Sequence, residues 1–182
     1  MLYQHGMVVI KPLHGGGGYG VIKVTCTNRI YSFMYMSRHR MFTSFEAMFR
    51  ALNRIKVGRK YMIQRGIRLA QIAGRPIDYR VKVVKQNGVW VYRAMVGRLA
   101  RPGLFVTNLC KGGTQLSANE GLSRSLRRKG VGRQKRQEMR VLTNTCVGIM
   151  ESRFPGIGQL GFDYGIDNNG KIWIFEVNTR PQ

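Results

Sequence analysis

Acidic residues are scarce in this chain: 8 Asp and Glu stand against 31 Lys and Arg in 182 residues, which gives a formal net charge of +23. A protein this basic is expected to meet an anionic partner, such as a nucleic acid, an anionic surface or a polyphosphate ligand. Charge alone does not choose among these partners. Solvated basic side chains, or an acidic protein partner, would account for it equally well.

Long apolar runs are also missing. No stretch approaches the roughly 18 residues of a membrane-spanning helix, and residues 1–16 lack the pattern of a secretory signal. The only cysteines, Cys26, Cys110 and Cys146, follow no disulfide or zinc spacing, so we expect reduced, partly buried thiols. These absences favour a cytoplasmic protein.

Short strands and two amphipathic helices dominate what is present. Hydrophobic residues make up 43% of the chain, enough for a core. A capping box from Thr43 to Glu46 predicts a helix that ends near Ile55, and apolar spacing predicts another over 134–153. We expect 97–133 to be mostly loop, with a short basic helix near 121–128. The predicted class is α+β, with strands over 7–10, 21–25, 30–36, 61–63, 78–85, 89–96, 160–166 and 171–177.

Carboxylates gather in the last predicted hairpin, which turns at residues 167–170. A turn centred on 168–169 places Asp163 diagonal to Glu176, whereas a turn centred on 169–170 places them directly opposite. In both registers Asp163, Glu176 and Asn178 share one face, since alternate strand residues point the same way. Oxygen ligands suit Mg²⁺ or Mn²⁺. The alternative is a surface hairpin whose acids pair with arginines, with Asp167 only stabilising the turn.

A glycine-rich loop, HGGGGYG over residues 14–20, follows the first predicted strand and Lys11. Such loops offer backbone N–H groups to phosphates, although this one lacks the Walker A pattern and also fits a flexible hairpin tip. Arg80 lies on one predicted strand and Arg98 just past the end of its neighbour, and either could reach a terminal phosphate. Together with the oxygen cluster, these features favour a nucleotide whose phosphates are bridged by Mg²⁺.

The order of these motifs resembles the ATP-grasp superfamily, and within it the YheC/YheD endospore coat-associated proteins; RimK-type ligases are more distantly similar. The motifs are VVIKP, HGGGGYG, YMIQRGI, DYRVKVV, RAMVGRLAR, TNLCKGG and GFDYGID…KIWIFEVNTRP. The resemblance implies one ATP-grasp domain over 1–182, truncated at both ends and lacking the usual N-terminal pre-ATP-grasp domain. About 1–60 would form a lid-like lobe and about 61–182 the metal- and phosphate-binding lobe.

The resemblance also implies roles for individual residues. Lys11 would contact the nucleotide phosphates and Gln64 the adenine edge. The lid loop would be formed by Gly15, Gly16, Gly17 and Gly18. The phosphate and acyl-phosphate region would be lined by Arg80, Arg98 and Asn108, and Mg²⁺ would be held by Asp163, Glu176 and Asn178.

The activity implied is that of an ATP- and magnesium-dependent ligase, which joins a carboxylate to an amine or thiol through an acyl phosphate. Its acceptor is open, and the basic surface could recruit an acidic substrate such as a polyglutamate tail. A different hypothesis is a non-catalytic basic module that binds nucleic acid or an anionic surface through residues 124–136. A third is a structural component associated with the spore coat.

Overall fold

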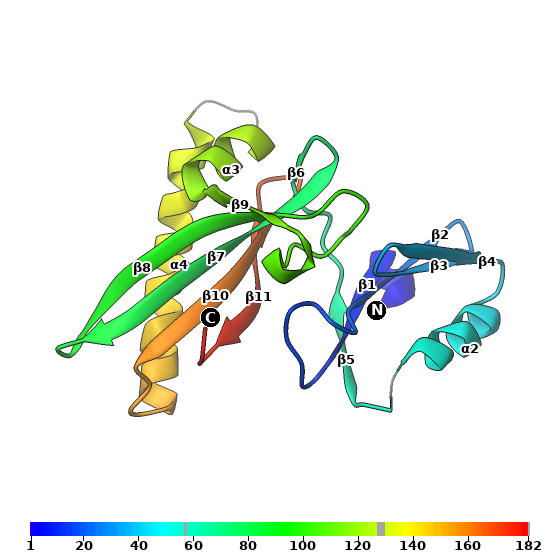
Figure 1. Cartoon of the computed structure of the whole chain (residues 1–182), viewed down its shortest axis with the longest axis horizontal. Coiled ribbons are helices and arrows are strands. Elements are labelled where there is room, and N and C mark those ends of the chain that lie inside the picture. The colour runs from blue at the N-terminus through cyan, green and yellow to red at the C-terminus, as the bar shows by residue number, and fades with distance from the viewer. Residues whose placement is uncertain (57, 127–129, 182) are drawn as a thin grey trace.

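Two antiparallel sheets, each backed by helices, form two lobes with a cleft between them (Figure 1). The computed structural model describes residues 1–56, 58–126 and 130–181. The small lobe has the sheet order β4-β3-β2-β1-β5, and the large lobe has β11-β10-β7-β8-β9, with β6 paired to β7. This arrangement confirms the predicted α+β class.

The small lobe contains the first seven elements. They are α1 (Leu2–His5), β1 (Met7–Pro12), β2 (Ile22–Thr27), β3 (Ile30–Tyr35), β4 (Arg38–Phe42), α2 (Phe45–Ile55) and β5 (Tyr61–Arg65). In β1, Val8 and Ile10 are buried beneath α2, whereas Val9 and Lys11 line the cleft. The alternation of a strand thus gives this sheet one core face and one cleft face. β5 pairs with β1, so the sheet extends to Arg65; the predicted lobe boundary near residue 60 stays a prediction.

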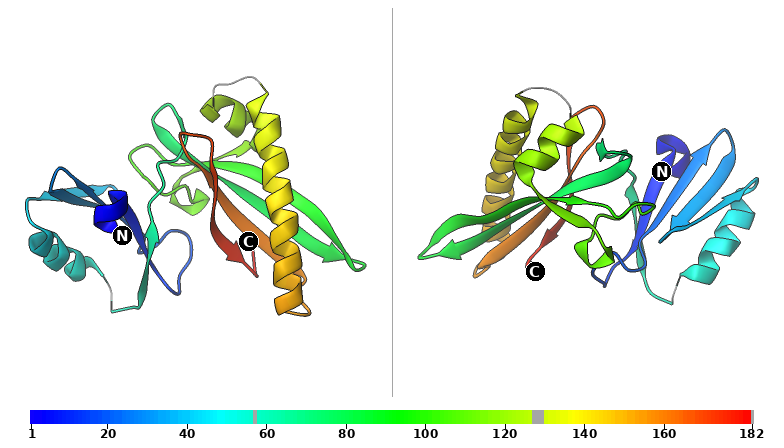
Figure 2. Two further views of the ribbon diagram at one scale, coloured as in Figure 1. Left: turned by 180° about the vertical axis from the view of Figure 1, so that it is seen from behind. Right: turned by 45° about the horizontal axis from the view of Figure 1, so that its top comes forward.

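The large lobe contains the remaining elements. They are β6 (Gln71–Ile72), β7 (Arg75–Gln86), β8 (Val89–Leu99), the 3₁₀ helix η1 (Leu109–Lys111), β9 (Thr114–Ser117), α3 (Ala118–Leu126), α4 (Val131–Arg153), β10 (Gln159–Ile166) and β11 (Ile172–Asn178). Figure 2 shows α4 crossing the face of this sheet that is turned away from the small lobe.

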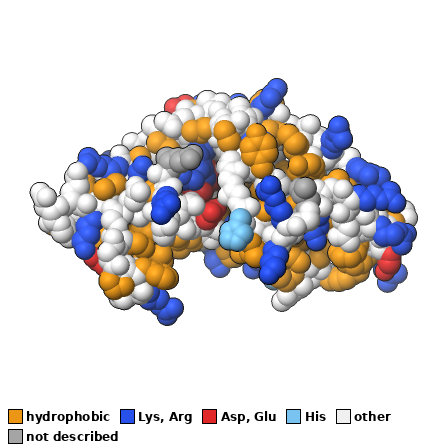
Figure 3. Space-filling model, turned by 60° about the horizontal axis from the view of Figure 1, so that its bottom comes forward, with side chains coloured by type: hydrophobic (Ala, Val, Ile, Leu, Met, Phe, Trp, Pro, Cys, Tyr) orange, Lys and Arg blue, Asp and Glu red, His pale blue; other side chains and the backbone are white. Residues whose placement is uncertain are grey.

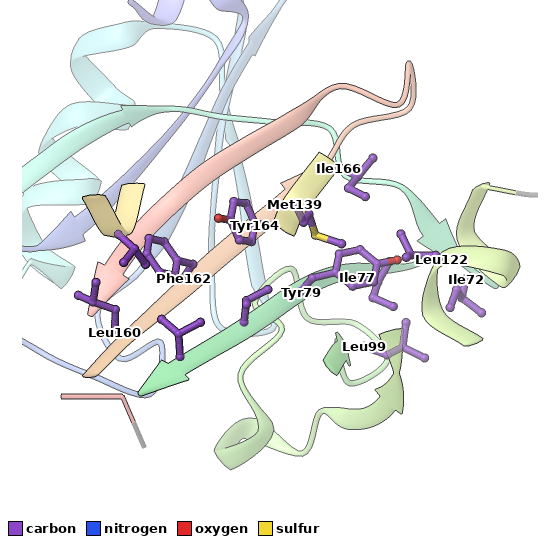
Figure 4. Close-up of a cluster of buried hydrophobic side chains, with 13 residues drawn as sticks. Ile72, Ile77, Tyr79, Leu99, Leu122, Met139, Leu160, Phe162, Tyr164 and Ile166 are labelled. Atoms are coloured by element: carbon purple, nitrogen blue, oxygen red, sulfur yellow. The ribbon is translucent and has the colours of Figure 1, made fainter. Parts of the chain in front are cut away.

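The main core lies between this sheet and α4 (Figure 4). Tyr79 and Tyr164 are fully buried there, and the Tyr164 hydroxyl hydrogen bonds to that of Thr143 on α4 at 2.8 Å. Fully buried apolar side chains of this core, such as Phe162 and Leu160, each contribute roughly 1.5–3 kcal/mol. The neighbouring residues Asp78 and Asp163 point to the opposite face, into the cleft.

Several local predictions need correction. The N-cap of α2 is Ser44, not Thr43, because the Ser44 backbone is extended and its hydroxyl accepts a hydrogen bond from the Ala47 amide at 3.1 Å. The prediction of mostly loop over 97–133 was wrong at the end of β8, at η1 and β9, and where α4 begins at Val131. The short helix predicted near 121–128 is confirmed by α3 over its described part. α3 ends at Leu126, and the predicted continuation over 127–128 lies outside the described residues. β4 was missed, because four of its five residues are exposed and its sequence carries no alternation of apolar and polar residues.

The cysteines are free, as predicted, but Cys110 is exposed instead of partly buried. Within the described residues, no helix is both long enough and apolar enough to cross a membrane.

Candidate active-site cleft

A cleft of about 1090 Å³ separates the two sheets. Figure 3 shows that red carboxylate and blue basic side chains meet in the hollow at the middle of the molecule. Every residue to which the resemblance assigned a nucleotide, metal or acyl-phosphate role lines this cleft. They are Lys11, Gly15, Gly16, Gly17, Gly18, Gln64, Arg80, Arg98, Asn108, Asp163, Glu176 and Asn178.

Two strands of the small lobe contact the last hairpin of the large lobe across the cleft. The Lys11 ammonium on β1 and the Gln64 amide on β5 each donate a hydrogen bond to the Phe175 carbonyl at 3.3 Å. Phe175 is the extra residue of a β-bulge, because the pairing of β10 with β11 shifts between Asp163 and Tyr164. A bulged residue leaves the ladder, which frees the Phe175 carbonyl to accept these bonds.

The glycine loop connects β1 to β2, so its position at a hairpin tip is confirmed. It rests on the large-lobe loop that leads into η1. The Cys110 thiol donates to the Gly17 carbonyl at 3.4 Å, and the Lys111 ammonium lies over the Tyr19 ring. Gly18 has a φ of +72°, and a Cβ added there would collide with the Asn108 side chain. The loop can approach this closely only because position 18 has no side chain.

The last hairpin adopts the register in which Asp163 lies directly opposite Glu176. The turn lies between Asp167 and Lys171, and the extra residue Phe175 shifts the register so that Asp163 still faces Glu176. The Lys171 backbone N–H group donates a hydrogen bond to the Asp167 side chain at 2.9 Å. The hydrogen bonds that Asp167 accepts from Trp173 and from the turn lower its pKa, although its partial burial acts in the opposite direction. Asp167 therefore stabilises the turn, as expected.

Arginines and carboxylates alternate across the floor of the cleft. Strand pairing places Arg80 opposite Asp163 and Arg98 opposite Asp78. Arg80 pairs with both oxygens of Asp163, and Arg98 reaches Asp163 at 3.2 Å. Arg98 also makes two hydrogen bonds to Asp78, at 2.8 and 2.6 Å. The predicted alternative of arginine pairing is thus realised at Asp163, but in a buried position instead of on a surface.

Asp78 was missed by the sequence analysis. Burial raises its pKa, against the lowering effect of the Arg98 guanidinium. Burial would by itself lower the pKa of Arg98, but the ion pairs with Asp78 and Asp163 raise it. The available signal was the motif DYR: positions 78 and 80 of one strand share a face, so a carboxylate beside Arg80 implied a charged partner nearby.

The oxygen-bearing side chains on β10 and β11 are of the chemical type that magnesium binds. Asp163 and Glu176 are opposed, Asn178 is two residues beyond Glu176 on the same face, and all three offer oxygen. Glu176 is exposed and makes no ion pair within the described part of the chain. Within the same part, no group of three His, Cys, Asp or Glu gathers, so Asn178 has to complete such a set.

Among the further cations of the cleft, which were not singled out by the sequence, two lie near one another. Lys23 on β2 and Arg68, between β5 and β6, both line it. Burial lowers the pKa of Lys23, and the nearby Arg68 charge lowers it further. The Lys23 ammonium lies 5.8 Å from the centre of the Phe105 ring. Alternation along β2 could have indicated that Lys23 points away from the core.

Solved structures with the same arrangement define the class of fold. D-alanyl-alanine synthetase A from Vibrio cholerae matches with a TM-score of 0.55 at 13% identity, over 97% of this chain and 43% of that one. Carboxyaminoimidazole ribonucleotide synthase from Aspergillus clavatus, complexed with ATP, matches with a TM-score of 0.54 at 16% identity, over 99% of this chain and 36% of that one. The chain has the ATP-grasp fold.

The particular family follows from sequence. A family model described as YheC/D like ATP-grasp matches residues 1–182, so the chain belongs to that family. Its sequence is 30% identical over 181 residues to the endospore coat-associated protein YheD of Bacillus subtilis (strain 168). That alignment covers 96% of this chain but 39% of YheD, so the chain spans less than half of this relative.

Proposed function

We propose that this chain binds ATP with magnesium and forms the catalytic core of a ligase that joins a carboxylate to an amine or thiol. The observation that carries the proposal is the convergence on one cleft of a glycine loop, Lys11 and the opposed pair Asp163 and Glu176. Loops rich in backbone N–H groups, basic side chains and oxygen ligands are the parts that phosphoryl transfer requires.

Within this proposal, the nucleotide lies between the sheets. The adenine packs against the apolar wall that includes Val9 and Met62, with its polar edge toward Gln64. The phosphates extend toward Lys11 and the N–H groups of the glycine loop. Asp163, Glu176 and Asn178 hold Mg²⁺, which supplies charge neutralisation at the phosphates.

The reaction has two steps. A carboxylate oxygen of the first substrate attacks the γ-phosphorus of ATP, which forms an acyl phosphate and releases ADP. The amine or thiol then attacks the acyl carbon and displaces inorganic phosphate. Arg80 and Arg98 lie on the cleft floor, where their charges stabilise the negative charge on the transferring group. Closure of the glycine loop onto Asn108 keeps water from hydrolysing the acyl phosphate.

Calorimetric titration of ATP, with and without Mg²⁺, tests the binding step. The wild-type chain should bind ATP in a magnesium-dependent manner, and Glu176→Gln should lose that dependence. The matched control is Glu120→Gln, which removes an exposed carboxylate that pairs with Arg124 on α3. Magnesium-independent binding of equal strength in wild type and Glu176→Gln would refute the proposal.

A nucleic-acid or surface-binding module is the second candidate, and less of the structure supports it. Residues 127–129 of the basic segment 124–136 lie outside the described residues. Within the described part, Arg124 pairs with Glu120 and Lys135 with Glu138, which offsets some of the charge. Binding to RNA or DNA that weakens steeply with salt would favour this candidate. A role in the spore coat rests on the likeness to YheD and would be tested by fractionating spores.

A further inference from the structure

The walls of the cleft carry more positive charge than a magnesium nucleotide can balance. Among the described residues, three carboxylates line it, Asp78, Asp163 and Glu176, against eight cations, which leaves a formal surplus of five positive charges. The cations are Lys11, Lys23, Arg65, Arg68, Arg75, Arg80, Arg98 and Arg180. Magnesium-bound ATP carries about two negative charges, so about three positive charges remain without a counter-charge.

The chain cannot supply that counter-charge itself. Of its 8 acidic residues, all of which lie in the described part of the chain, only these three line the cleft. Asp163 and Asp78 are already engaged by Arg80 and Arg98. A cavity whose fixed charges exceed those of its proposed first ligand attracts a second anion, because like charges held close in a partly dry site repel one another.

Lys23 and Arg68 supply two of the positive charges that the cleft leaves unbalanced. Neither forms an ion pair with a carboxylate within the described residues, whereas Arg65 lies over the Trp173 ring at 4.9 Å. Lys23 is half-buried, and Arg68 lies close enough for its charge to lower the pKa of Lys23. A half-buried ammonium beside a second cation costs stability unless a ligand compensates it.

We propose that the carboxylate substrate, which binds beside the nucleotide, is a small polyanion with about three negative charges, whose non-reacting anionic groups bind Lys23 and Arg68. This inference rests on the proposed ligase function, which supplies the reaction. It adds that the carboxylate substrate carries several negative charges, and it names the two side chains that would select that substrate. An acidic polymer that binds the outer surface is the competing reading.

Calorimetry with tricarballylate, a tricarboxylate, and acetate, a monocarboxylate, tests the inference, with and without Mg²⁺ and a non-hydrolysable ATP analogue. We expect tricarballylate to bind at least about tenfold more tightly than acetate, since each charge-assisted hydrogen bond contributes roughly 1.5–3 kcal/mol. Lys23→Gln and Arg68→Gln should each weaken tricarballylate about tenfold. Arg153→Gln, which removes the same charge from an exposed position on α4, should have less than about a twofold effect.

Each outcome of the test is decisive. Equal binding of tricarballylate and acetate overturns the inference, and so does equal weakening by Lys23→Gln and Arg153→Gln. If polyglutamate binds but tricarballylate does not, and all three variants weaken polyglutamate equally, the positive charge recruits acidic polymers to the outer surface. That result also overturns the inference. If the nucleotide analogue fails to bind while tricarballylate binds through Lys23, the ligase proposal falls and the polyanion site stands. Thermal unfolding of each variant confirms that it is folded.

Discussion

Asp163 and Arg80 occupy opposed positions on β10 and β7, and their side chains form a two-point ion pair on the cleft floor. The same carboxylate is the central member of the proposed magnesium set. A carboxylate paired with two arginines is a weaker metal ligand, because each guanidinium competes with the ion for its oxygens. This relationship links the metal affinity of the cleft to its arginines.

Replacement of Arg80 tests that link. In Arg80→Gln, Asp163 retains only the longer contact with Arg98, so the Mg²⁺ concentration needed for half-maximal ATP binding should fall. Affinity for ATP at saturating Mg²⁺ should also fall, by about tenfold, because one charged phosphate contact is lost. Calorimetry at several Mg²⁺ concentrations measures both effects. Arg93→Gln, at an exposed position on β8, is the control, and an unchanged magnesium requirement in Arg80→Gln would contradict the link.

Glycine substitutions separate lid closure from simple loop flexibility. Gly18→Ala should weaken ATP binding by about tenfold, because the added methyl group meets Asn108 and the positive φ disfavours alanine. Gly16→Ala adds the same methyl group where nothing lies within 4 Å and φ is not positive, so its effect should be small. Calorimetric affinities of the two variants make the comparison. Equal weakening by both would mean that contact with Asn108 does not matter.

The buried pair of Asp78 and Arg98 should dominate the stability of the cleft floor. Asp78→Asn leaves the buried Arg98 guanidinium without its main partner, which should lower the free energy of unfolding by about 3 kcal/mol. Glu120→Gln breaks an exposed pair on α3 and should cost about 0.5 kcal/mol or less. Urea unfolding measures both variants. Similar losses in the two would show that burial does not distinguish the pairs.

Lys23 should make anion binding depend on pH. Its pKa lies below the ordinary value of 10.5, so the folded chain releases this proton at a lower pH than the unfolded chain. Between the two pKa values the unfolded state binds more protons, so the contribution of Lys23 to stability rises with pH. Tricarballylate affinity should fall over the same range, since the ammonium is lost.

Lys23→Arg is the matched control for this dependence, because a guanidinium does not titrate there. We expect it to remove the alkaline loss of tricarballylate affinity while retaining binding at pH 7. Affinities measured by calorimetry from pH 7 to about pH 10 provide the test. A parallel loss in wild type and Lys23→Arg would assign the pH dependence to another group.

Much of the site could be predicted, because the positions of its residues relative to one another follow from local sequence patterns. Strand alternation places Asp163, Glu176 and Asn178 on one face, and the glycine run has the composition of a close-contact loop. Sequence spacing also predicted α2 and α4, since their apolar residues recur with a helical period. The sequence did not identify Ser44 as the N-cap of α2, because Thr43 and Ser44 can both cap a helix and the backbone conformation decides which one does.

The sequence by itself determined the composition, the shortage of acidic residues and the local elements, since these depend on residues close along the chain. Tertiary structure decided which charges meet. Arg80 and Asp163 come together through the pairing of β7 with β10, two strands far apart in sequence, and the same pairing brings Arg98 of β8 within reach of Asp163. The approach of Lys23 to Arg68 likewise depends on contacts between segments that are distant in sequence. No local pattern of residues encodes a distance between two lobes, because that distance is set by all the contacts that hold the lobes together.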